Sequence, residues 1–166
     1  MTTTEKNPIP DMLRREVKQW ATMGHHSLLQ RYLLERGSEH VSQPLPPKYA
    51  RGRKRECFRN AIRLAKRYPK VLRYVEGYAL CGTPLLIHHA WTIDADNRVV
   101  DPTWDDPEVS FYFGRVFTLA EWERETDRTG GMSVLDGLGL NHVFMFDDAP
   151  GLQAVIEATA ARKVAA

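Results

Sequence analysis

The sequence predicts an α+β domain in which a cysteine-bearing helix packs on an antiparallel sheet, with an extra helical pair at the N-terminus. Two patterns indicate it: apolar residues at helical spacing up to residue 68, then strand-like apolar runs separated by turn sequences. With 166 residues, 43% of them hydrophobic, we expect a single domain over 1–166. It divides into N-terminal helices and a proline-rich connector (1–47), a central core (48–148) and a C-terminal helix (149–166).

The N-terminal helical pair is expected over 12–23 and 28–36. Asp11 is the expected N-cap of the first helix, and Gly24 is expected to interrupt it. Gly37 is expected to close the second helix in the left-handed conformation. Prolines within 42–47 exclude a helix there, so that segment is expected to be a connector.

The third expected helix, over 56–68, carries Cys57 in its first turn and is ended by Pro69. Cysteine reacts as the thiolate, and the unpaired amides of a helix N-terminus supply positive potential that favours this form. Arg53 and Arg55, from the basic segment 48–55, could add to that potential. Because many free cysteines are small core residues, the position alone does not identify a nucleophile.

Strands are expected over 72–80, 85–94 and 98–101, as antiparallel neighbours joined by turns at 82–84 and 94–97. A further strand is expected over 109–117, and then a capping box at Thr118 and Glu121 that opens a helix to about Thr126. Beyond it we expect a glycine-rich loop over 130–139, a strand over 142–147 and an alanine-rich helix over 151–163.

Composition narrows the class of protein. A net charge of +2 is a mild basic lean, not the strong field of a polyanion binder. The polar first residues lack signal-peptide character and no apolar run reaches the roughly 18 residues of a membrane span, so a cytoplasmic location without membrane contact is expected. The cysteines, Cys57 and Cys81, form no C-x-x-C pair and no disulfide scaffold. No cofactor and no metal site are expected.

A candidate base and acid follow Cys57, as His89 on one expected strand and Asp101 on the next. Strand residues alternate between faces, so the loop length decides whether the two meet. A three-residue loop over 95–97, with Asn97 left-handed, pairs Trp91 with Asp101 and puts His89 and Asp101 on one face, roughly 7–8 Å apart at the backbone. A two-residue loop would separate them.

Four short motifs occur in order along the chain: ECFRNA at 56–61, YVEGYA at 74–79, HAW at 89–91 and VVDPTW at 99–104. Together they resemble small bacterial and phage proteins of the transglutaminase-like, papain-like cysteine-enzyme superfamily, in which a cysteine opens a helix and a histidine and an acid lie on successive strands. The resemblance implies a papain-like/transglutaminase-like core with catalytic roles for Cys57, His89 and Asp101. It leaves the N-terminal helices and everything after Trp104 unexplained.

The same resemblance implies an oxyanion site made by the Cys57 amide and an upstream side chain. Helix N-termini aim amides at developing negative charge, which makes the Cys57 amide the safer half. The tryptophans of the motifs shield the triad or simply belong to the core. The candidate substrate and oxyanion residues are Gln43, Tyr49, Asn60, Trp91 and Trp104.

Other polar residues near the motifs have competing interpretations. Strand alternation turns His88 away from the face of His89, which favours a structural or surface role. Glu76 and Gly77 either line the cleft or make packing contacts, and packing is favoured. A zinc site from both cysteines, His88 and His89 would need adjacent strand residues to point the same way, so it is disfavoured.

The sequence favours an enzyme: a thiol-dependent acyl-transfer enzyme of peptidase, deamidase or transglutaminase type, acting on a peptide or carboxamide bond of a protein or peptide substrate. One alternative is a non-catalytic binding or inhibitor protein on the same fold, including a phage-encoded one. A nucleic-acid-binding protein acting through the basic run 48–55 ranks lower, because the run is short.

Overall fold

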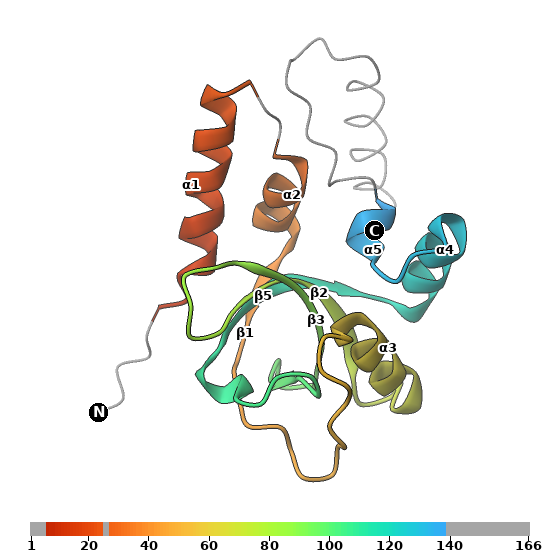
Figure 1. Cartoon of the computed structure of the whole chain (residues 1–166). Helices are drawn as coiled ribbons and strands as arrows, with labels where there is room; N and C mark the ends of the chain where they lie inside the picture. The colour runs from red at the N-terminus through yellow and green to blue at the C-terminus, as the bar shows by residue number, and fades with distance from the viewer. Residues whose placement is uncertain (1–5, 25–26, 139–166) are drawn as a thin grey trace.

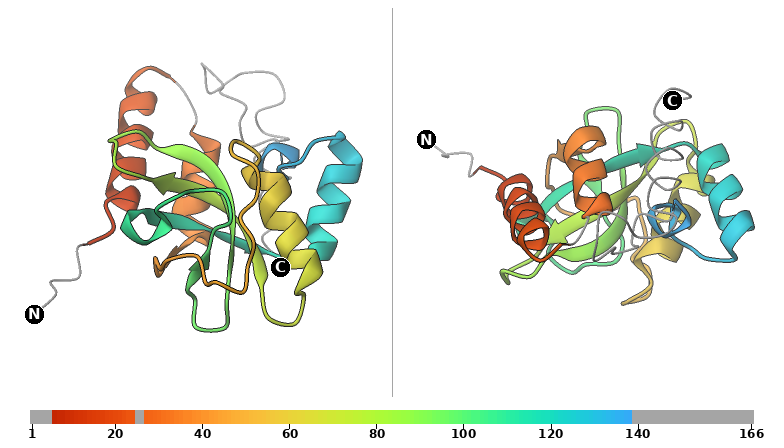
Figure 2. Two further views of the ribbon diagram at one scale, coloured as in Figure 1. Left: turned by 60° about the horizontal axis from the view of Figure 1, so that its bottom comes forward. Right: turned by 90° about the horizontal axis from the view of Figure 1, so that it is seen from above.

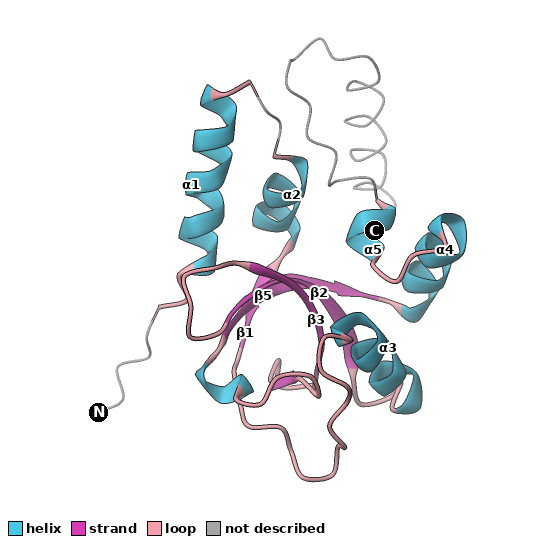
Figure 3. Cartoon of the chain, viewed as in Figure 1, coloured by secondary structure: helices cyan, strands magenta, loops and turns pink. Residues whose placement is uncertain are grey.

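The computed structural model describes residues 6–24 and 27–138, which form a mixed α+β structure on a curled antiparallel sheet (Figures 1 and 3). The strands lie in the order β1-β5-β2-β3-β4. The helices are α1 (Ile9–Thr22), α2 (Leu28–Arg36), α3 (Cys57–Arg67), α4 (Leu119–Thr129) and α5 (Val134–Gly137). The strands are β1 (Ser38–His40), β2 (Arg73–Leu80), β3 (Ile87–Ile93), β4 (Val99–Val100) and β5 (Phe111–Phe117), and a 3-10 turn, η1, spans Pro107–Val109.

The two faces of the sheet are covered differently. On one face, residues of α1, α2, α3 and α5 form a core with strand residues such as Tyr74, Ala90 and Phe113. On the other face the buried members come from the strands, among them Trp91 and Tyr112, with Trp104 from the loop after β4 packed against them. Figure 2 shows α1 and α2 towards one end of the sheet and α3 and α4 towards the other.

The N-terminal helices form as expected, with two corrections. Pro8, not Asp11, is the N-cap of α1, because Pro10 is tolerated in a first helical turn and lets the helix begin earlier. Gly37 has a φ of −84° and is extended, not left-handed, because the chain enters β1 directly after it. A Cβ there would lie 2.7 Å from the Leu33 carbonyl oxygen, so close packing explains this glycine.

The hairpin that carries the candidate base and acid has the expected register. Asn97 is left-handed, with a φ of 62°, and the Asp94 amide donates to the Arg98 carbonyl at 3.0 Å. β3 and β4 then pair Thr92 with Val100. The expectation of a three-residue turn is confirmed.

The region after the hairpin is confirmed in part. The strand expected from residue 109 begins at Phe111, because η1 precedes it. The capping box of Thr118 and Glu121 opens α4, which continues to Thr129. The expected loop over 130–139 is wrong at its centre, where α5 forms.

One strand differs from the sequence prediction, and two predicted elements fall outside the described residues. The sequence does not predict the short strand β1, which pairs with β5. The expected strand over 142–147 and helix over 151–163 lie outside the described residues. Within the described ranges, no helix combines the length and apolar character needed to cross a membrane.

Candidate active site

Cys57 is the first residue of α3, which packs along β3. Amides in the first turn of a helix have no acceptor within the helix, so they leave positive potential around this residue. The rest of α3 anchors it: Ala61, Ile62 and Ala65 are buried in the core beneath the helix. Cys57 itself is only partly buried, so α3 fixes its position without fully enclosing the residue.

His89 and Asp101 form the central contact of the site. His89 Nε2 lies 2.7 Å from Asp101 Oδ2, and both side chains are almost fully buried. Because a carboxylate accepts, Nε2 carries the donated proton and Nδ1 is left as the basic nitrogen of the neutral ring. The expected pairing of this base and acid on one face is confirmed.

Asp101 is held by two further donors. The Thr103 amide donates to Oδ1 at 2.8 Å, and the Tyr112 hydroxyl donates to Oδ2 at 3.0 Å. Burial opposes ionisation of this carboxyl, but the charge of His89 and these hydrogen bonds hold the pKa of Asp101 below its usual value. Asp101 therefore stays ionised and fixes the ring of His89.

Aromatic rings enclose the His89–Asp101 pair. Trp104 stacks on the His89 ring with centroids 4.3 Å apart and planes 19° apart. Trp91 also stacks on it at 6.0 Å, and Tyr112 meets Trp91 edge-on. Gly114 makes this possible, since a Cβ there would lie 2.7 Å from the Trp91 ring. The rings keep water from the pair and so strengthen its electrostatic interaction.

The side chain of Cys57 interacts with His89. β4 pairs with β3 only through Val99 and Val100, so His89 lies on a part of β3 that β4 leaves unpaired. Burial favours the neutral thiol, but a hydrogen bond and Coulomb attraction from His89, with backbone hydrogen bonds from Ala90 and Phe58, lower the pKa of Cys57. The thiolate is thus favoured where the site places it.

The pKa of His89 shifts in the opposite direction to that of Cys57. Burial disfavours its cationic form, but the charge and hydrogen bond of Asp101, with a further contribution from Cys57, raise the pKa of His89 to about 9. A lowered thiol pKa beside a raised imidazole pKa favours a thiolate–imidazolium ion pair. Such a pair is an activated nucleophile with its proton already on the neighbouring base.

Asn60 organises the loop before α3. Its side-chain amide donates to the Arg53 carbonyl at 2.7 Å and to Thr103 Oγ1 at 3.0 Å, and its oxygen accepts from the Arg53 amide. These bonds tie the approach to Cys57 to the residues after Asp101. The side chain is committed to this structural role.

Gln43 and Tyr49, two further candidates for the oxyanion site, are engaged in other contacts. Gln43 donates its side-chain amide to the Val99 carbonyl at 2.9 Å. Tyr49 is buried in a separate small cluster with Leu64, Leu72 and Val100. The Cys57 amide remains in place at the N-terminus of α3, and the two tryptophans lie around His89.

His88 and Glu76 lie on the opposite face of the sheet from His89, as alternation indicates. His88 Nε2 is 3.9 Å from Glu76 Oε2 and its ring meets Phe58 edge-on. Glu76 is fully buried and accepts from Tyr74, from the Ser133 hydroxyl and from the first two amides of α5. Burial raises the pKa of Glu76 against these donors. Glu76 anchors α5.

Sequence reasoning missed Tyr112 and Thr103 as partners of Asp101. Thr103 carries a local signal, because the amide two residues after an aspartate commonly donates a hydrogen bond to its carboxylate. Tyr112 carries none, since its place depends on β5 pairing with β2.

The described residues contain no group of three or more histidine, cysteine or acidic side chains arranged to hold a metal ion. Chemically, the arrangement suits nucleophilic attack by sulfur, with His89 moving the proton and Asp101 orienting His89. The chain matches no protein-family model, no curated protein and no solved structure.

Proposed function

We propose that this protein is a thiol-dependent acyl-transfer enzyme that acts on a peptide or carboxamide bond through Cys57, His89 and Asp101. One observation carries the proposal: a buried imidazole, fixed by Asp101 at 2.7 Å, acts on the thiol at the start of α3 so that its pKa falls while that of His89 rises to about 9. A structural cysteine needs none of these partners.

In the proposed reaction, His89 Nδ1 holds the proton of Cys57 and the thiolate attacks the carbonyl carbon of the substrate. The Cys57 amide stabilises the oxyanion. The intermediate collapses to a thioester when the amine or ammonia leaves with the proton from His89. Water or a second amine then attacks the thioester, gives its proton to His89 and releases the acyl group, which regenerates the thiol.

We propose further that the fold is a papain-like/transglutaminase-like core with an extra N-terminal helical pair. The order of the site supports this assignment, because the cysteine opens a helix and the histidine and acid follow on neighbouring antiparallel strands. The packing of the cysteine-bearing helix on that sheet agrees with it.

Trapping the thioester tests the proposal. The full chain is incubated with a cell lysate, and the peptide that contains Cys57 is analysed by mass spectrometry with and without hydroxylamine, which cleaves thioesters. We expect an acyl adduct on Cys57 that hydroxylamine removes, and no adduct in His89→Ala. Cys81 is the internal control and should carry none.

The same experiment separates the enzyme from a binding protein. An activated thiol that never forms a thioester, with any lysate or with defined peptide and glutamine substrates, would contradict the proposed acyl transfer. Adducts formed equally on Cys57 and Cys81 would indicate unselective thiol chemistry and would also contradict it.

A further inference from the structure

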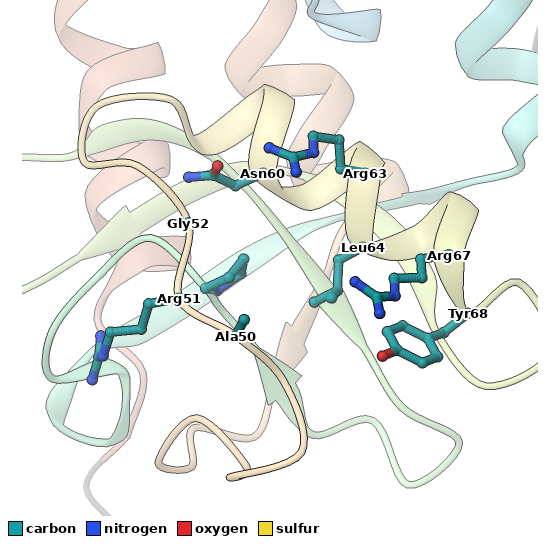
Figure 4. Close-up of a pocket in the computed structure, with 9 residues that line it drawn as sticks. Ala50, Arg51, Gly52, Asn60, Arg63, Leu64, Arg67 and Tyr68 are labelled. Atoms are coloured by element: carbon teal, nitrogen blue, oxygen red, sulfur yellow. The ribbon is translucent and has the colours of Figure 1, made fainter.

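A pocket of about 130 Å³ lies between α3 and the preceding segment 50–52 (Figure 4). This volume is below the roughly 300 Å³ typical of the smallest pockets for drug-sized ligands, so the pocket suits one small chemical group. Cys57, His89 and Asp101 do not line it. Its walls are Ala50, Arg51, Gly52, Asn60, Arg63, Leu64, Arg67, Tyr68 and Pro102.

The pocket is basic. Among the described residues that line it there are three arginines and no carboxylate. Arg51 is already engaged, because its guanidinium donates to the carbonyls of Trp104 and Asp105, and Figure 4 shows it directed away from the other two. Arg63 and Arg67 therefore supply the charge of the pocket.

Arg63 and Arg67 carry positive charge that the described residues leave unneutralised. Neither forms an ion pair there, whereas Arg59 and Lys66 on the same helix pair with Glu56 and Glu123. Residues four apart are neighbours on a helix face, and like charges at that spacing repel each other. An anion bound between the two guanidinium groups would remove this repulsion.

Tyr68 adds a neutral donor beside them. Within the described part of the chain its hydroxyl makes no hydrogen bond, and Figure 4 shows it directed to the same side as the Arg67 guanidinium group, while the Arg63 guanidinium group extends towards Asn60. The Arg67 guanidinium carbon lies 5.6 Å from the centre of its ring. Planar guanidinium donors with a hydroxyl are the groups that proteins use to bind phosphate oxygens.

The opposite wall is fixed by hydrogen bonds within the protein. The Gly52 amide donates to the Pro102 carbonyl at 2.7 Å, and Asn60 bonds both the Arg53 backbone and Thr103. A Cβ at residue 52 would lie 2.2 Å from the Asn60 side chain, so this contact requires glycine. The wall is therefore already in place for a ligand.

We propose that this pocket binds one phosphate group, held by the guanidinium groups of Arg63 and Arg67 and the hydroxyl of Tyr68. Free inorganic phosphate and the phosphate of a small phosphomonoester share this chemistry. The site is independent of the proposed acyl transfer, since none of the three catalytic candidates lines the pocket.

Calorimetric titration of the full chain with inorganic phosphate at constant ionic strength tests the site. We expect saturable binding that Arg63→Gln/Arg67→Gln weakens about tenfold or more, because two charge-assisted contacts are lost. The matched control is Arg59→Gln/Lys66→Gln, which removes the same charge from other positions of α3 and should change the affinity by less than about twofold. Tyr68→Phe should weaken binding about two- to tenfold.

Titrations with two further ligands identify the chemical class of ligand that the pocket binds. Glycerol phosphate in place of inorganic phosphate distinguishes a phosphomonoester from the free ion, and tighter binding of either supports the site. Acetate bound as tightly as phosphate would overturn the ligand class. No saturable binding at millimolar phosphate, or equal weakening in both double variants, would overturn the site itself. Alkylation of Cys57 in Arg63→Gln/Arg67→Gln should be unchanged, which separates this result from the test of the enzyme.

Discussion

At the scale of single residues, the site depends on how firmly Asp101 holds His89. The contact is buried, short and shielded by stacked rings, so the two charges interact with little screening. That interaction raises the pKa of the imidazole and, through it, lowers the pKa of the thiol. Asp101 thus acts on Cys57 without touching it.

Asp101→Asn should lower the pKa of His89 from about 9 by about one to three units, because the opposing charge is lost while the shape is kept. Titration of the histidine resonances by NMR measures the change. His40, whose partners are Asn97 and Gly114, is the internal control and should keep its pKa. An unchanged pKa of His89 would contradict the assigned role of Asp101.

Tyr112→Phe should destabilise the protein by about 1–3 kcal/mol, because Asp101 loses a buried donor. Tyr49→Phe is the matched control: Tyr49 is also buried, but no hydrogen bond of its hydroxyl is found within the described residues, so a change within about 0.5 kcal/mol is expected. Urea denaturation gives both values. Equal effects would show that the Tyr112 hydroxyl adds nothing at Asp101.

The residues of the site were predictable to different degrees. Cys57, His89 and Asp101 follow from motif order and strand alternation, which are local properties of the sequence. The contact of Tyr112 with Asp101 depends on the pairing of β5 with β2, which no local pattern specifies. The commitment of Asn60 to the Arg53 backbone likewise depends on how the preceding loop folds back.

At the scale of elements, the β3–β4 hairpin sets which face the acid occupies. Its three-residue turn places Asn97 in the left-handed region, and the Asn97 side chain also bonds the Glu39 carbonyl and lies 2.7 Å from His40 Nδ1. The turn therefore fixes both the register of β4 and its contact with β1. The sequence indicates this turn because asparagine tolerates the left-handed conformation.

Asn97→Ala should be less stable than Asn97→Gly by about 1 kcal/mol. Both variants lose the same side-chain bonds, so the difference isolates the cost of placing a Cβ at a φ of 62°. Thermal unfolding of the two proteins measures it. Equal stability would mean that the turn relaxes, and the register argument would then fail.

Glu76→Gln should destabilise the protein by about 1–3 kcal/mol, because the carboxylate accepts from four donors and an amide would bring a donor to face some of them. Glu123→Gln, at an exposed pair with Lys66, is the control and should stay within about 0.5 kcal/mol. Denaturant titration compares them. An unchanged free energy of unfolding in Glu76→Gln would show that the carboxylate does not hold α5.

Two elements were missed for physical reasons. β1 has only three residues and exists through its pairing with β5. α5 has four residues, and its first amides are held by Glu76 from the centre of the sheet. Elements made by tertiary contacts leave little periodicity in the sequence, whereas α3 and the β2–β3–β4 strands carry a clear pattern.

At the scale of the whole molecule, the shifted pKa values of the site make the stability of the fold depend on pH. Folding raises the pKa of His89 from an ordinary value of 6.5 to about 9, so its contribution is fully present below pH 6.5 and is lost as pH rises through about 9. The lowered pKa of Cys57 has the opposite effect on stability: its contribution is present at high pH and is lost as the pH falls. In the ion pair the folded state gains one proton and loses another, so the two effects largely cancel near pH 8.

Cys57→Ala should remove this cancellation. In that variant the pKa of His89 should lie above 6.5 but below about 9, because Asp101 still raises it and the contribution of Cys57 is lost. Between pH 6.5 and that pKa the free energy of unfolding should fall by about 1 kcal/mol per pH unit, while the wild-type value stays nearly flat. Urea denaturation across this pH range measures both slopes. Cys81→Ala is the control and should follow the wild type. Parallel slopes for Cys57→Ala and wild type would contradict the ion pair.

The strand order across the whole sheet could not be predicted from the sequence. Hairpin neighbours were predictable from turn lengths, but β5 returns to pair with β2 and not with β4. That crossover brings Tyr112 onto the face of His89 and encloses the His89–Asp101 pair.

The most direct test of the account is the rate at which iodoacetamide alkylates each cysteine near neutral pH, followed by mass spectrometry. Both thiols are partly buried, so access alone does not favour either. If His89 activates the thiol, Cys57 reacts much faster than Cys81, and His89→Ala abolishes the difference. Slow and equal alkylation of Cys57 and Cys81 in the wild-type protein would contradict the central claim.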